Sequence, residues 1–249
     1  MAYQDNNQFK LAIIGYGQMG REIERVAKSQ GINVTEIFEI DNPVSSDKDY
    51  AFDIAIDFSY PENVLANIEN VAKLGKNLVV GTTGWYDKID YVKRIVESYE
   101  IGFLYSSNFS IGVNLFFRII EYASSLIDKF DDFDIYGNEI HHVRKKDSPS
   151  GTARKLAEII FKNVSRKTEL VSSRIDGLIS PHQLHFSSIR GGDVFGEHTI
   201  WLDSVSDNIQ LTHRAKNRIG FAKGAVEAAK WIYGKKGFYS FDDMLMSLW

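Results

Sequence analysis

The feature that most constrains the fold of this chain is a glycine turn between a short apolar run and an amphipathic helical pattern. Residues 9–14 have the composition of a buried strand, and Gly15-x-Gly17-x-x-Gly20 follows at once. Ile23 and Val26 continue the apolar face of a helix. A strand, a glycine turn and a helix in this order begin a βαβ unit, and such units build parallel sheets.

The same alternation continues over about the first 100 residues. Further buried strands are predicted at residues 34–39, 53–58, 78–80 and 103–105. Helical patterns lie between them, with their apolar residues three or four positions apart. The sequence therefore predicts an α/β fold with a Rossmann-type parallel sheet that carries helices on both faces.

The pattern changes after residue 108. A long apolar helix is expected from Val113 to Ile127. Strand-like stretches without intervening helices follow at residues 185–189, 198–202 and 209–213. They predict an α+β domain with a mostly antiparallel sheet for residues 109–216. A last helical pattern around Ala225 is expected to return to the first domain, which would comprise residues 1–108 and 217–249.

The composition describes an ordinary globular protein without thiol chemistry. Of the 249 residues 44% are hydrophobic and 25% charged, and the formal net charge is −4. This balance gives no general attraction to nucleic acid or to an anionic membrane. The lack of cysteine excludes disulfides and thiolate sites. The polar N-terminus does not look like a signal peptide, and no apolar run could cross a bilayer, so we expect a cytoplasmic protein without a membrane partner.

The glycine turn is a candidate site for a dinucleotide. Its glycines allow a tight turn, a close approach of pyrophosphate to the backbone, and close packing of helix on strand. The helix N-terminus offers free N–H groups and a positive dipole end to phosphates. Glu39 comes 19 residues after Gly20, at the end of the second predicted strand, which suits a carboxylate that binds ribose hydroxyls.

Two further segments follow predicted strands of the first domain. They are Gly81-Thr82-Thr83-Gly84 and Ser106-Ser107-Asn108-Phe109. Open α/β sheets bind ligands at the carboxyl ends of their strands. Both segments are therefore expected to reach the nicotinamide half of the cofactor.

A short segment of the second domain gathers groups that the reduction of a carboxylated imine needs. If the strand expected near residue 139 continues to residue 145, alternation places His141 and Lys145 on one face and His142 on the other. Histidine can donate a proton near neutral pH. We therefore expect a reductase in which His141 is the proton donor and Lys145 holds a carboxylate or assists as a cation.

The residues that follow predict a carboxylate cradle at the start of a helix. Ser148 suits the N-cap and Pro149 the first helical position. The first amides of a helix have no internal partners. Ser150, Gly151 and Thr152 would therefore present their N–H groups to a carboxylate, together with two hydroxyls.

Two other interpretations of this region fit less well. Arg144-Lys145-Lys146 is short for a nucleic-acid patch in a chain of negative net charge. No compact ligand spacing accompanies the potential metal ligands, so we expect no metal. Those potential ligands are His141, His142, Asp147, His185 and His198.

Taken together, these motifs make the chain resemble the 4-hydroxy-tetrahydrodipicolinate reductase family, also called dihydrodipicolinate reductase, of bacterial lysine and diaminopimelate biosynthesis. The resemblance runs nearly from end to end. The His-His-x-x-Lys segment followed by Pro-Ser-Gly-Thr is highly specific for this family. The other matching segments are residues 15–20, 81–84, 108–112, 139–142, 147–153, 190–193, 196–199 and 212–215.

The resemblance implies NAD(P)H-dependent reduction of the dehydrated form of 4-hydroxy-tetrahydrodipicolinate to tetrahydrodipicolinate. It implies a homotetramer built through the sheet of the second domain. It implies that His141 is the general acid, that Lys145 is its catalytic partner, and that the substrate carboxylates are held by His142, Ser150, Gly151 and Thr152. The cofactor would be bound by Gly15, Tyr16, Gly17, Gln18, Met19, Gly20, Glu39, Gly81, Thr83, Ser106, Phe109, Arg218 and Phe221.

One departure from some relatives concerns the choice of cofactor. Those relatives carry arginine directly after the ribose-binding acid, where it can meet the 2′-phosphate of NADPH. Ile40 cannot make that contact, and Glu39 repels phosphate. We therefore expect NADH to be used at least as well as NADPH.

Two other functions remain open at this level. One is a related NAD-dependent dehydrogenase of an amino acid or imine, which would turn over another imine or oxo acid faster. The other is a regulator that binds NAD(H) without catalysis. The constellation of His141, Lys145 and Gly151 argues against the regulator, since a sensor has no need of a carboxylate cradle.

Overall fold

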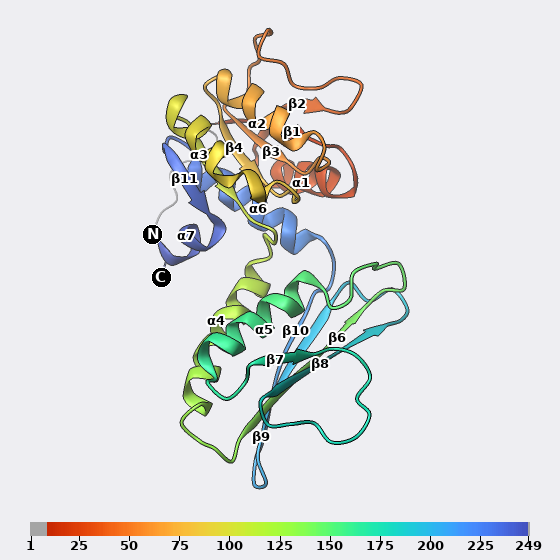
Figure 1. The fold of residues 1–249 in the computed structure, drawn as a ribbon. Helices are drawn as coiled ribbons and strands as arrows, with labels where there is room; N and C mark the ends of the chain where they lie inside the picture. Colours follow the sequence, from red (N-terminus) through yellow and green to blue (C-terminus); the bar gives the residue numbers. More distant parts are fainter. Residues whose placement is uncertain (1–8, 249) are drawn as a thin grey trace. The chain divides into compact units, whose positions relative to one another are not determined.

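The computed structural model describes residues 9–248, and the chain divides into two compact units (Figure 1). Unit 1 comprises Met1–Ile111 and Arg218–Trp249, and unit 2 comprises Gly112–Asn217. Among the described residues, no helix is long and apolar enough to cross a membrane.

Unit 1 is built on a six-stranded sheet in which every pairing is parallel. From one edge to the other the strands are β2 (Asn33–Phe38), β1 (Lys10–Ile14), β3 (Ile54–Asp57), β4 (Asn77–Val80), β5 (Gly102–Tyr105) and β11 (Gly237–Ser240). The chain passes from β1 to one side for β2 and to the other side for β3. The strand order therefore reverses between β1 and β3, and open α/β sheets bind ligands at such a point.

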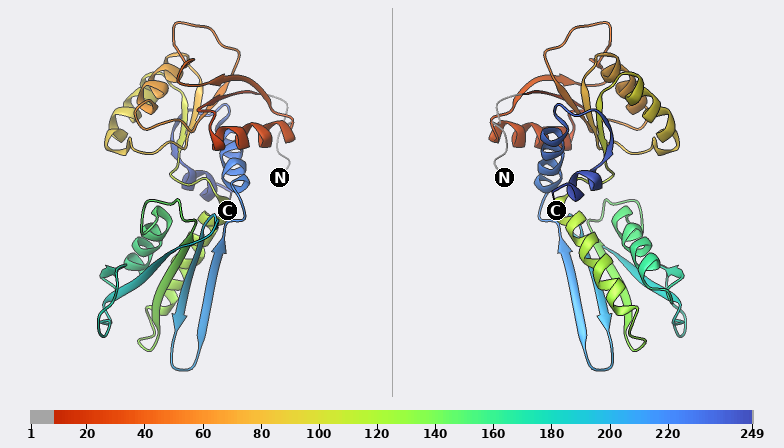
Figure 2. Two further views of the ribbon diagram at one scale, coloured as in Figure 1. Left: turned by 90° about the vertical axis from the view of Figure 1, so that its right-hand side faces the viewer. Right: turned by 90° about the vertical axis from the view of Figure 1, so that its left-hand side faces the viewer.

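Helices cover both faces of this sheet (Figure 2). Successive residues of each strand point to opposite faces, so each face contributes to its own core. Leu11 and Ile13 belong to the core under α1 (Gln18–Ser29), α6 (Ile219–Ile232) and α7 (Phe241–Met246). Ala12 and Ile14 belong to the core under α2 (Val64–Lys73) and α3 (Ile89–Ser98), which the short helix η1 (Tyr86–Lys88) precedes. Helix α6 packs against α1, so the last long helical pattern does return to the parallel sheet. The predicted Rossmann-type architecture is confirmed.

Unit 2 contains a five-stranded mixed sheet. Its strands, in spatial order, are β10 (Asn208–Arg214), β9 (Glu197–Asp203), β6 (Asp134–His141), β8 (Gln183–Arg190) and β7 (Glu169–Val171). The β10–β9 and β9–β6 pairs are antiparallel, whereas β6–β8 and β8–β7 are parallel. The parallel pairs arise because the chain returns along the sheet twice, through α5 (Gly151–Asn163) between β6 and β7 and through residues 172–182 between β7 and β8.

Both long helices of unit 2 pack on the same face of its sheet. Helices α4 (Ile111–Ile127) and α5 share a core with Ile135, Phe186 and Ile200. A side chain at Gly137 would come within 2.8 Å of Phe186 and Ile200, so the helices and strands leave no room for one there. Because alternate residues of β6 face this core, Glu139 and His141 lie on its helix-covered side, both buried.

Two local predictions for the segment after Glu139 are wrong. Strand β6 ends at His141, and the amide of Lys145 then donates to the carbonyl of His142 over 3.1 Å, which closes a turn. His141 and Lys145 are therefore not alternate residues of one strand. The N-cap of α5 is Ser150 and not Ser148, because the Ser150 hydroxyl is the group that accepts the amide of Ala153, at 3.2 Å.

Candidate active site

The glycine turn opens onto a hollow in unit 1 at the carboxyl ends of β1, β3 and β4. The hollow has a volume of about 460 Å³. It lies where the strand order reverses, as expected for a ligand site of an open α/β sheet. Its lining residues are Gly17, Gln18, Met19, Phe58, Ser59, Pro61, Gly81, Thr82, Thr83 and Arg218.

The glycines of the turn have different physical roles. A Cβ atom at Gly20 would lie 2.2 Å from the carbonyl oxygen of Gly15, so Gly20 is required for helix α1 to pack on its own turn. A Cβ atom at Gly17 would meet no protein atom within 4 Å. Gly17 is the N-cap of α1 and has no capping side chain, so open space lies before the first amides of the helix. This arrangement fits the pyrophosphate of a dinucleotide.

A buried aspartate that the sequence interpretation did not single out organises the loops around this hollow. Asp57, at the end of β3, is fully buried. It accepts hydrogen bonds from the amide and hydroxyl of Ser59, at 2.9 and 2.7 Å, from Thr82 Oγ1 at 2.6 Å, and from Asn67 at 2.9 Å. Burial raises the pKa of Asp57 and these hydrogen bonds oppose the rise. Asp57 thereby ties the loop after β3 to the loop after β4.

Other residues predicted to bind the cofactor lie near the turn or at the ends of strands. The Tyr16 hydroxyl bonds to the Glu24 carboxylate, which raises the pKa of Tyr16. Glu39 is exposed directly after β2, and its backbone pairs with Asn42.

Seven of the residues predicted to bind the cofactor do not line the hollow, namely Gly15, Tyr16, Gly20, Glu39, Ser106, Phe109 and Phe221. The Ser106 hydroxyl bonds to the backbone of Asn108. Phe109 is 1% exposed and packs against Phe58 and Phe241, so its side chain belongs to the core. Phe221 is half-buried in the first turn of α6.

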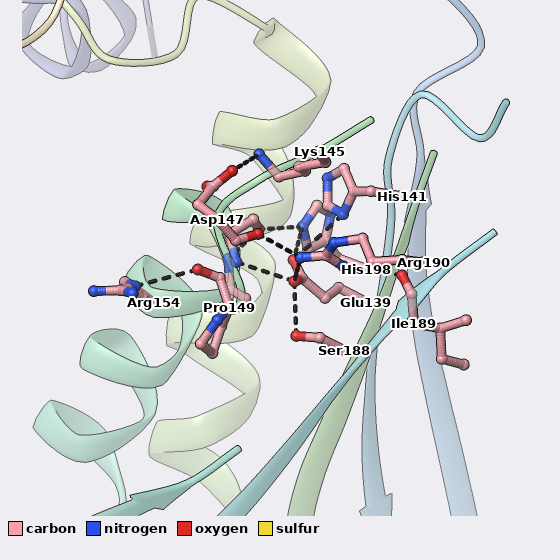
Figure 3. Close-up of polar contacts among 12 residues, drawn as sticks. Glu139, His141, Lys145, Asp147, Pro149, Arg154, Ser188, Ile189, Arg190 and His198 are labelled. Carbon is pink, nitrogen blue, oxygen red and sulfur yellow. Dashed lines mark hydrogen bonds and ion pairs between the residues drawn. The ribbon is translucent and has the colours of Figure 1, made fainter. Parts of the chain in front are cut away.

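In unit 2, the segment around His141 surrounds a buried carboxylate (Figure 3). Glu139 is fully buried on β6, and its Oε1 atom accepts three hydrogen bonds: from the Ser150 amide at 3.0 Å, the Ser188 hydroxyl at 2.8 Å and the Arg190 guanidinium at 2.9 Å. Its Oε2 atom lies 3.5 Å from His141 Nδ1 and 3.4 Å from His198 Nε2. The Glu139 cluster is defined here as Glu139, His141, Ser150, Ser188, Arg190 and His198.

The charge of Glu139 is fixed by its neighbours. Burial alone would raise the pKa of this carboxyl, but hydrogen bonds from His198, Ser150, Arg190 and Ser188 hold it well below its usual range. Glu139 is therefore a carboxylate throughout the physiological pH range. No local pattern in the sequence reveals this role, because the partners on β8 lie 49 and 51 residues away along the chain.

His141 is a neutral imidazole at pH 7 in this environment. Its side chain is 8% exposed, and this burial lowers the pKa to about 4. The Glu139 charge opposes the shift, whereas His198, Lys145 and Arg190 add to it. The ring also lies close to the chain at Gly196, where a Cβ atom would be 3.0 Å from Nε2 of His141.

The predicted carboxylate cradle is present in part. The amide of Ser150 donates to Glu139. Its hydroxyl accepts from the amide of Ala153 and lies 3.2 Å from His198 Nε2. Ser150 is 2% exposed, so neither its amide nor its hydroxyl is available to a ligand. The expectation that Ser150 presents its amide to a ligand is therefore wrong. Gly151 and Thr152 open helix α5, where amides lack internal partners. A Cβ atom at Gly151 would meet nothing within 4 Å, so a ligand has room there.

The basic residues of the segment differ in their exposure and in their ion-pair partners. Lys145 is half-buried and forms an ion pair of 2.7 Å with Asp147, whose pKa it lowers against the effect of burial. Arg144 is exposed and pairs with Asp193 at 2.7 Å. His142 is half-buried, and its amide donates to the carbonyl of Val194.

A cation is poorly suited to the Glu139 cluster. One potential ligand atom from each of Glu139, His141 and His198 lies within 4.8 Å of the others. However, the Arg190 guanidinium already binds the carboxylate, and Lys145 adds positive charge to the surroundings of His141. We therefore treat these residues as a hydrogen-bonding cluster and assign no metal to them.

Comparisons with known proteins identify the family of this chain. The family model for the N-terminal part of dihydrodipicolinate reductase matches residues 9–109, and that for its C-terminal part matches residues 112–245. This chain belongs to the dihydrodipicolinate reductase family. The resemblance seen in its sequence motifs is therefore confirmed, and the family is one of pyridine-nucleotide-dependent reductases.

Relatives of known name are similar over nearly their full length. The chain is 35% identical to the 4-hydroxy-tetrahydrodipicolinate reductase of Christiangramia forsetii over 240 residues, covering 96% of this chain and 98% of that protein. It is 40% identical to the enzyme of that name from Archaeoglobus fulgidus over 262 residues, covering 95% and 99%.

A solved structure shows the same fold. It is the dipicolinate-bound dihydrodipicolinate reductase from a Paenisporosarcina species, with a TM-score of 0.73 and 21% identity. The match covers 95% of this chain and 99% of that one.

Proposed function

We propose that this protein reduces the dehydrated form of 4-hydroxy-tetrahydrodipicolinate to tetrahydrodipicolinate, a step of lysine and diaminopimelate biosynthesis. The observation that carries the proposal is the placement of His141, 3.5 Å from a buried carboxylate, in the segment that leads to the open N-terminus of α5. This placement supplies a proton-transferring group and a carboxylate-binding group within one unit of a reductase-family chain.

The substrate carboxylates would be held by the amides of Gly151 and Thr152, the Thr152 hydroxyl and Lys145. The dipole of α5 favours an anion at this end of the helix. Lys145 would exchange its pairing with Asp147 for a substrate carboxylate, because the two anions compete for one ammonium group. His142 lies next in the chain to His141 and is proposed to complete the pocket on that side.

His141 would transfer the proton of the reaction. Its pKa of about 4 means that the free protein holds a neutral ring at pH 7. A dianionic substrate would offset the positive charge of Lys145 and raise the pKa of His141, since nearby negative charge favours imidazolium. Protonation of His141 would therefore accompany substrate binding.

The hollow of unit 1 would bind the cofactor, which supplies a hydride when it is bound. The turn from Gly15 to Gly20, which includes Tyr16, Gln18 and Met19, would hold the pyrophosphate, and Glu39 the ribose hydroxyls. Gly81, Thr83 and Arg218 would border the nicotinamide half, and Ser106, Phe109 and Phe221 would take part through their backbones. Ile40, 71% exposed, offers no charge to a 2′-phosphate, which supports use of NADH at least as well as NADPH.

We also propose that the protein works as a homotetramer in the cytoplasm. Helices α4 and α5 share a core with one face of the unit 2 sheet. On the opposite face, Tyr136 and Trp201 stack with ring centroids 5.3 Å apart. Aromatic residues on a sheet face suit an interface between copies of the chain. Analytical ultracentrifugation of the purified chain tests this assembly.

The proposed reaction is tested by following NADH absorbance with the aldol product of pyruvate and aspartate semialdehyde. We expect oxidation of NADH that depends on this substrate. Faster turnover of another imine or oxo acid would favour a related dehydrogenase. Binding of NADH without any turnover would favour a regulator.

A further inference from the structure

The two oxygen atoms of Glu139 have different partners (Figure 3). Three donors, from Ser150, Ser188 and Arg190, converge on Oε1 and fix the carboxylate group. The Oε2 atom faces the rings of His141 and His198. One oxygen atom is thus used for anchoring, while the other directs negative charge at two imidazoles.

We propose that Glu139 is a positioning residue that holds His141 in the tautomer protonated at Nδ1, so that Nε2 is the atom that gains and transfers the proton. The identity of the proton acceptor rests on the proposed function. The tautomer itself is a property of this chain without ligand, and it can be measured separately.

The electrostatic reason lies in the contact between Oε2 and Nδ1, which are 3.5 Å apart. An unprotonated Nδ1 would place its lone pair next to a charged oxygen, whereas a protonated Nδ1 places a partly positive hydrogen atom there, in an electrostatic contact and not a regular hydrogen bond. Both atoms are buried, so water screens the difference little. A carboxylate that orients an imidazole through one nitrogen atom and leaves the other for chemistry is a known arrangement in acyl-transfer enzymes.

His198 shares the same oxygen atom by the same reasoning. Its Nε2 lies 3.4 Å from Oε2 of Glu139 and 3.2 Å from the Ser150 hydroxyl. Protonation at Nε2 lets this ring donate toward both acceptors. His198 therefore links Glu139 to Ser150, the residue that caps helix α5. The ring that transfers the proton and the helix that binds the carboxylate are thus held by one side chain, Glu139.

Gly196 keeps space beside the reactive edge of the ring. A Cβ atom there would lie 3.0 Å from Nε2 and 3.3 Å from Cδ2 of His141. The φ angle of Gly196, +153°, is also one that residues with side chains rarely adopt. The Nδ1 edge of the His141 ring thus faces the negative charge of Glu139, whereas the Nε2 edge is bordered by Gly196, which has no side chain.

The proton transfer balances in this arrangement. The Nε2–H bond of protonated His141 breaks, its electron pair stays on Nε2, and the proton forms a bond to the substrate that has received hydride. The ring returns to the neutral form that is protonated at Nδ1. The charged and titratable groups that act on this ring are Glu139 on its own strand, Arg190 on β8, His198 on β9 and Lys145 after the turn.

The decisive measurement is nitrogen NMR of histidine-labelled, ligand-free protein at pH 8, with His141 assigned by its loss in His141→Gln. We expect Nδ1 of His141 to be the protonated nitrogen and Nε2 the unprotonated one. The reverse assignment in the unaltered protein overturns the proposal. This result is independent of the NADH assay, so failure of the proposed reaction and failure of the proposed tautomer are told apart.

A variant at Glu139 provides the second test. In Glu139→Gln the amide oxygen can still accept from Ser150, Ser188 and Arg190, which directs the amide NH₂ group at the two histidines. We expect His141 to change to the Nε2-protonated tautomer and kcat to fall by at least about tenfold. The dissociation constant for NADH should be unchanged, because Glu139 belongs to unit 2 and the hollow to unit 1.

Asp134→Asn is the matched control, with the same carboxylate-to-amide change on the same strand. Asp134 pairs with Lys167 at 2.7 Å and belongs to no part of the Glu139 cluster. We expect this variant to keep both the tautomer and kcat. A folded Glu139→Gln protein that keeps the Nδ1-protonated tautomer and kcat within twofold would falsify the proposal. If Glu139→Gln does not fold, the NMR assignment of the unaltered protein decides.

Discussion

The hollow of unit 1 and the Glu139 cluster of unit 2 differ in the chemical groups that form them. Where the glycine turn borders the hollow, backbone and missing side chains shape it, since a Cβ atom at Gly17 would meet nothing and one at Gly20 would meet a carbonyl oxygen. The Glu139 cluster is made of charged and polar side chains gathered around one buried carboxylate. In the first region function depends on space and amide groups, and in the second on charge and protonation state.

This difference leads to different responses to mutation. A backbone site tolerates changes of nearby side chains and is sensitive to an added Cβ atom. A buried network is sensitive to changes that keep the shape of a side chain and alter only its charge or hydrogen bonding. The following experiments test whether the two regions separate in this way.

The largest expected effect is that of His141→Gln. The variant keeps a hydrogen-bonding side chain and removes the group that transfers the proton. We expect kcat to fall by roughly 100- to 10,000-fold, with NADH affinity retained, as measured by steady-state kinetics and fluorescence titration. Full turnover in this variant would exclude His141 as the acid. A loss of NADH affinity would show that the two regions are not independent.

A pair of glycine variants tests the backbone site. We expect Gly20→Ala to destabilise the protein by roughly 1–3 kcal/mol, because its Cβ atom overlaps the Gly15 carbonyl oxygen. We expect Gly17→Ala to fold with normal stability and to bind NADH about tenfold more weakly, about 1.4 kcal/mol. Urea denaturation and NADH titration give both values. Unchanged NADH binding by Gly17→Ala would contradict the placement of the pyrophosphate.

The dependence of stability on pH tests the buried network. The pKa of His141 falls from 6.5 to about 4 on folding, so the unfolded chain binds a proton that the folded chain does not. Stability from this group is complete above pH 6.5 and is lost as the pH falls toward 4. Between pH 7.5 and pH 5 we expect a loss of about 2 kcal/mol.

Urea denaturation at the two pH values measures this loss, and His141→Gln should remove it. The pKa of His213 is also lowered by burial, so a smaller part of the slope should remain in that variant. An equal slope in both proteins would show that His141 is not buried as described.

The smallest expected effect concerns the choice of cofactor. Ile40→Arg would place a cation directly after Glu39, on an exposed position. We expect KM for NADPH to fall by about fivefold, about 1 kcal/mol, with KM for NADH little changed. Ile40→Gln is the matched control, because it has a similar reach without charge. An equal effect of both substitutions would show that the 2′-phosphate is not recognised by charge here.

The fold of unit 1 could be predicted from the sequence because its information is local. Each strand is a short apolar run, each helix a periodic pattern, and the glycine turn sits between the first two.

The sequence patterns do not predict strands β7 and β11, because both strands are short and none of their residues is fully buried. The start of α5 was placed two residues early because Ser148 and Ser150 are both plausible caps by sequence.

Some residues of the candidate site could be predicted from the sequence, and others could not. His141, Lys145, Gly151 and Thr152 form a recognisable segment, since their chemical types stand close together in the sequence. Asp57 and Glu139 gave no such signal. Each is a single acidic residue at a strand, and only its burial and its partners on other strands distinguish it from a solvated one.

The sequence by itself determined that a dinucleotide-type turn begins the chain and that a histidine, a lysine and a small-residue helix start stand together in its second half. Local spacing and residue type are enough for that. The tertiary structure alone decided that Glu139 lies between His141, His198 and Arg190 and that Ser150 faces inward. Those contacts depend on the register of β6 against β8 and β9, which brings together residues that no local pattern connects.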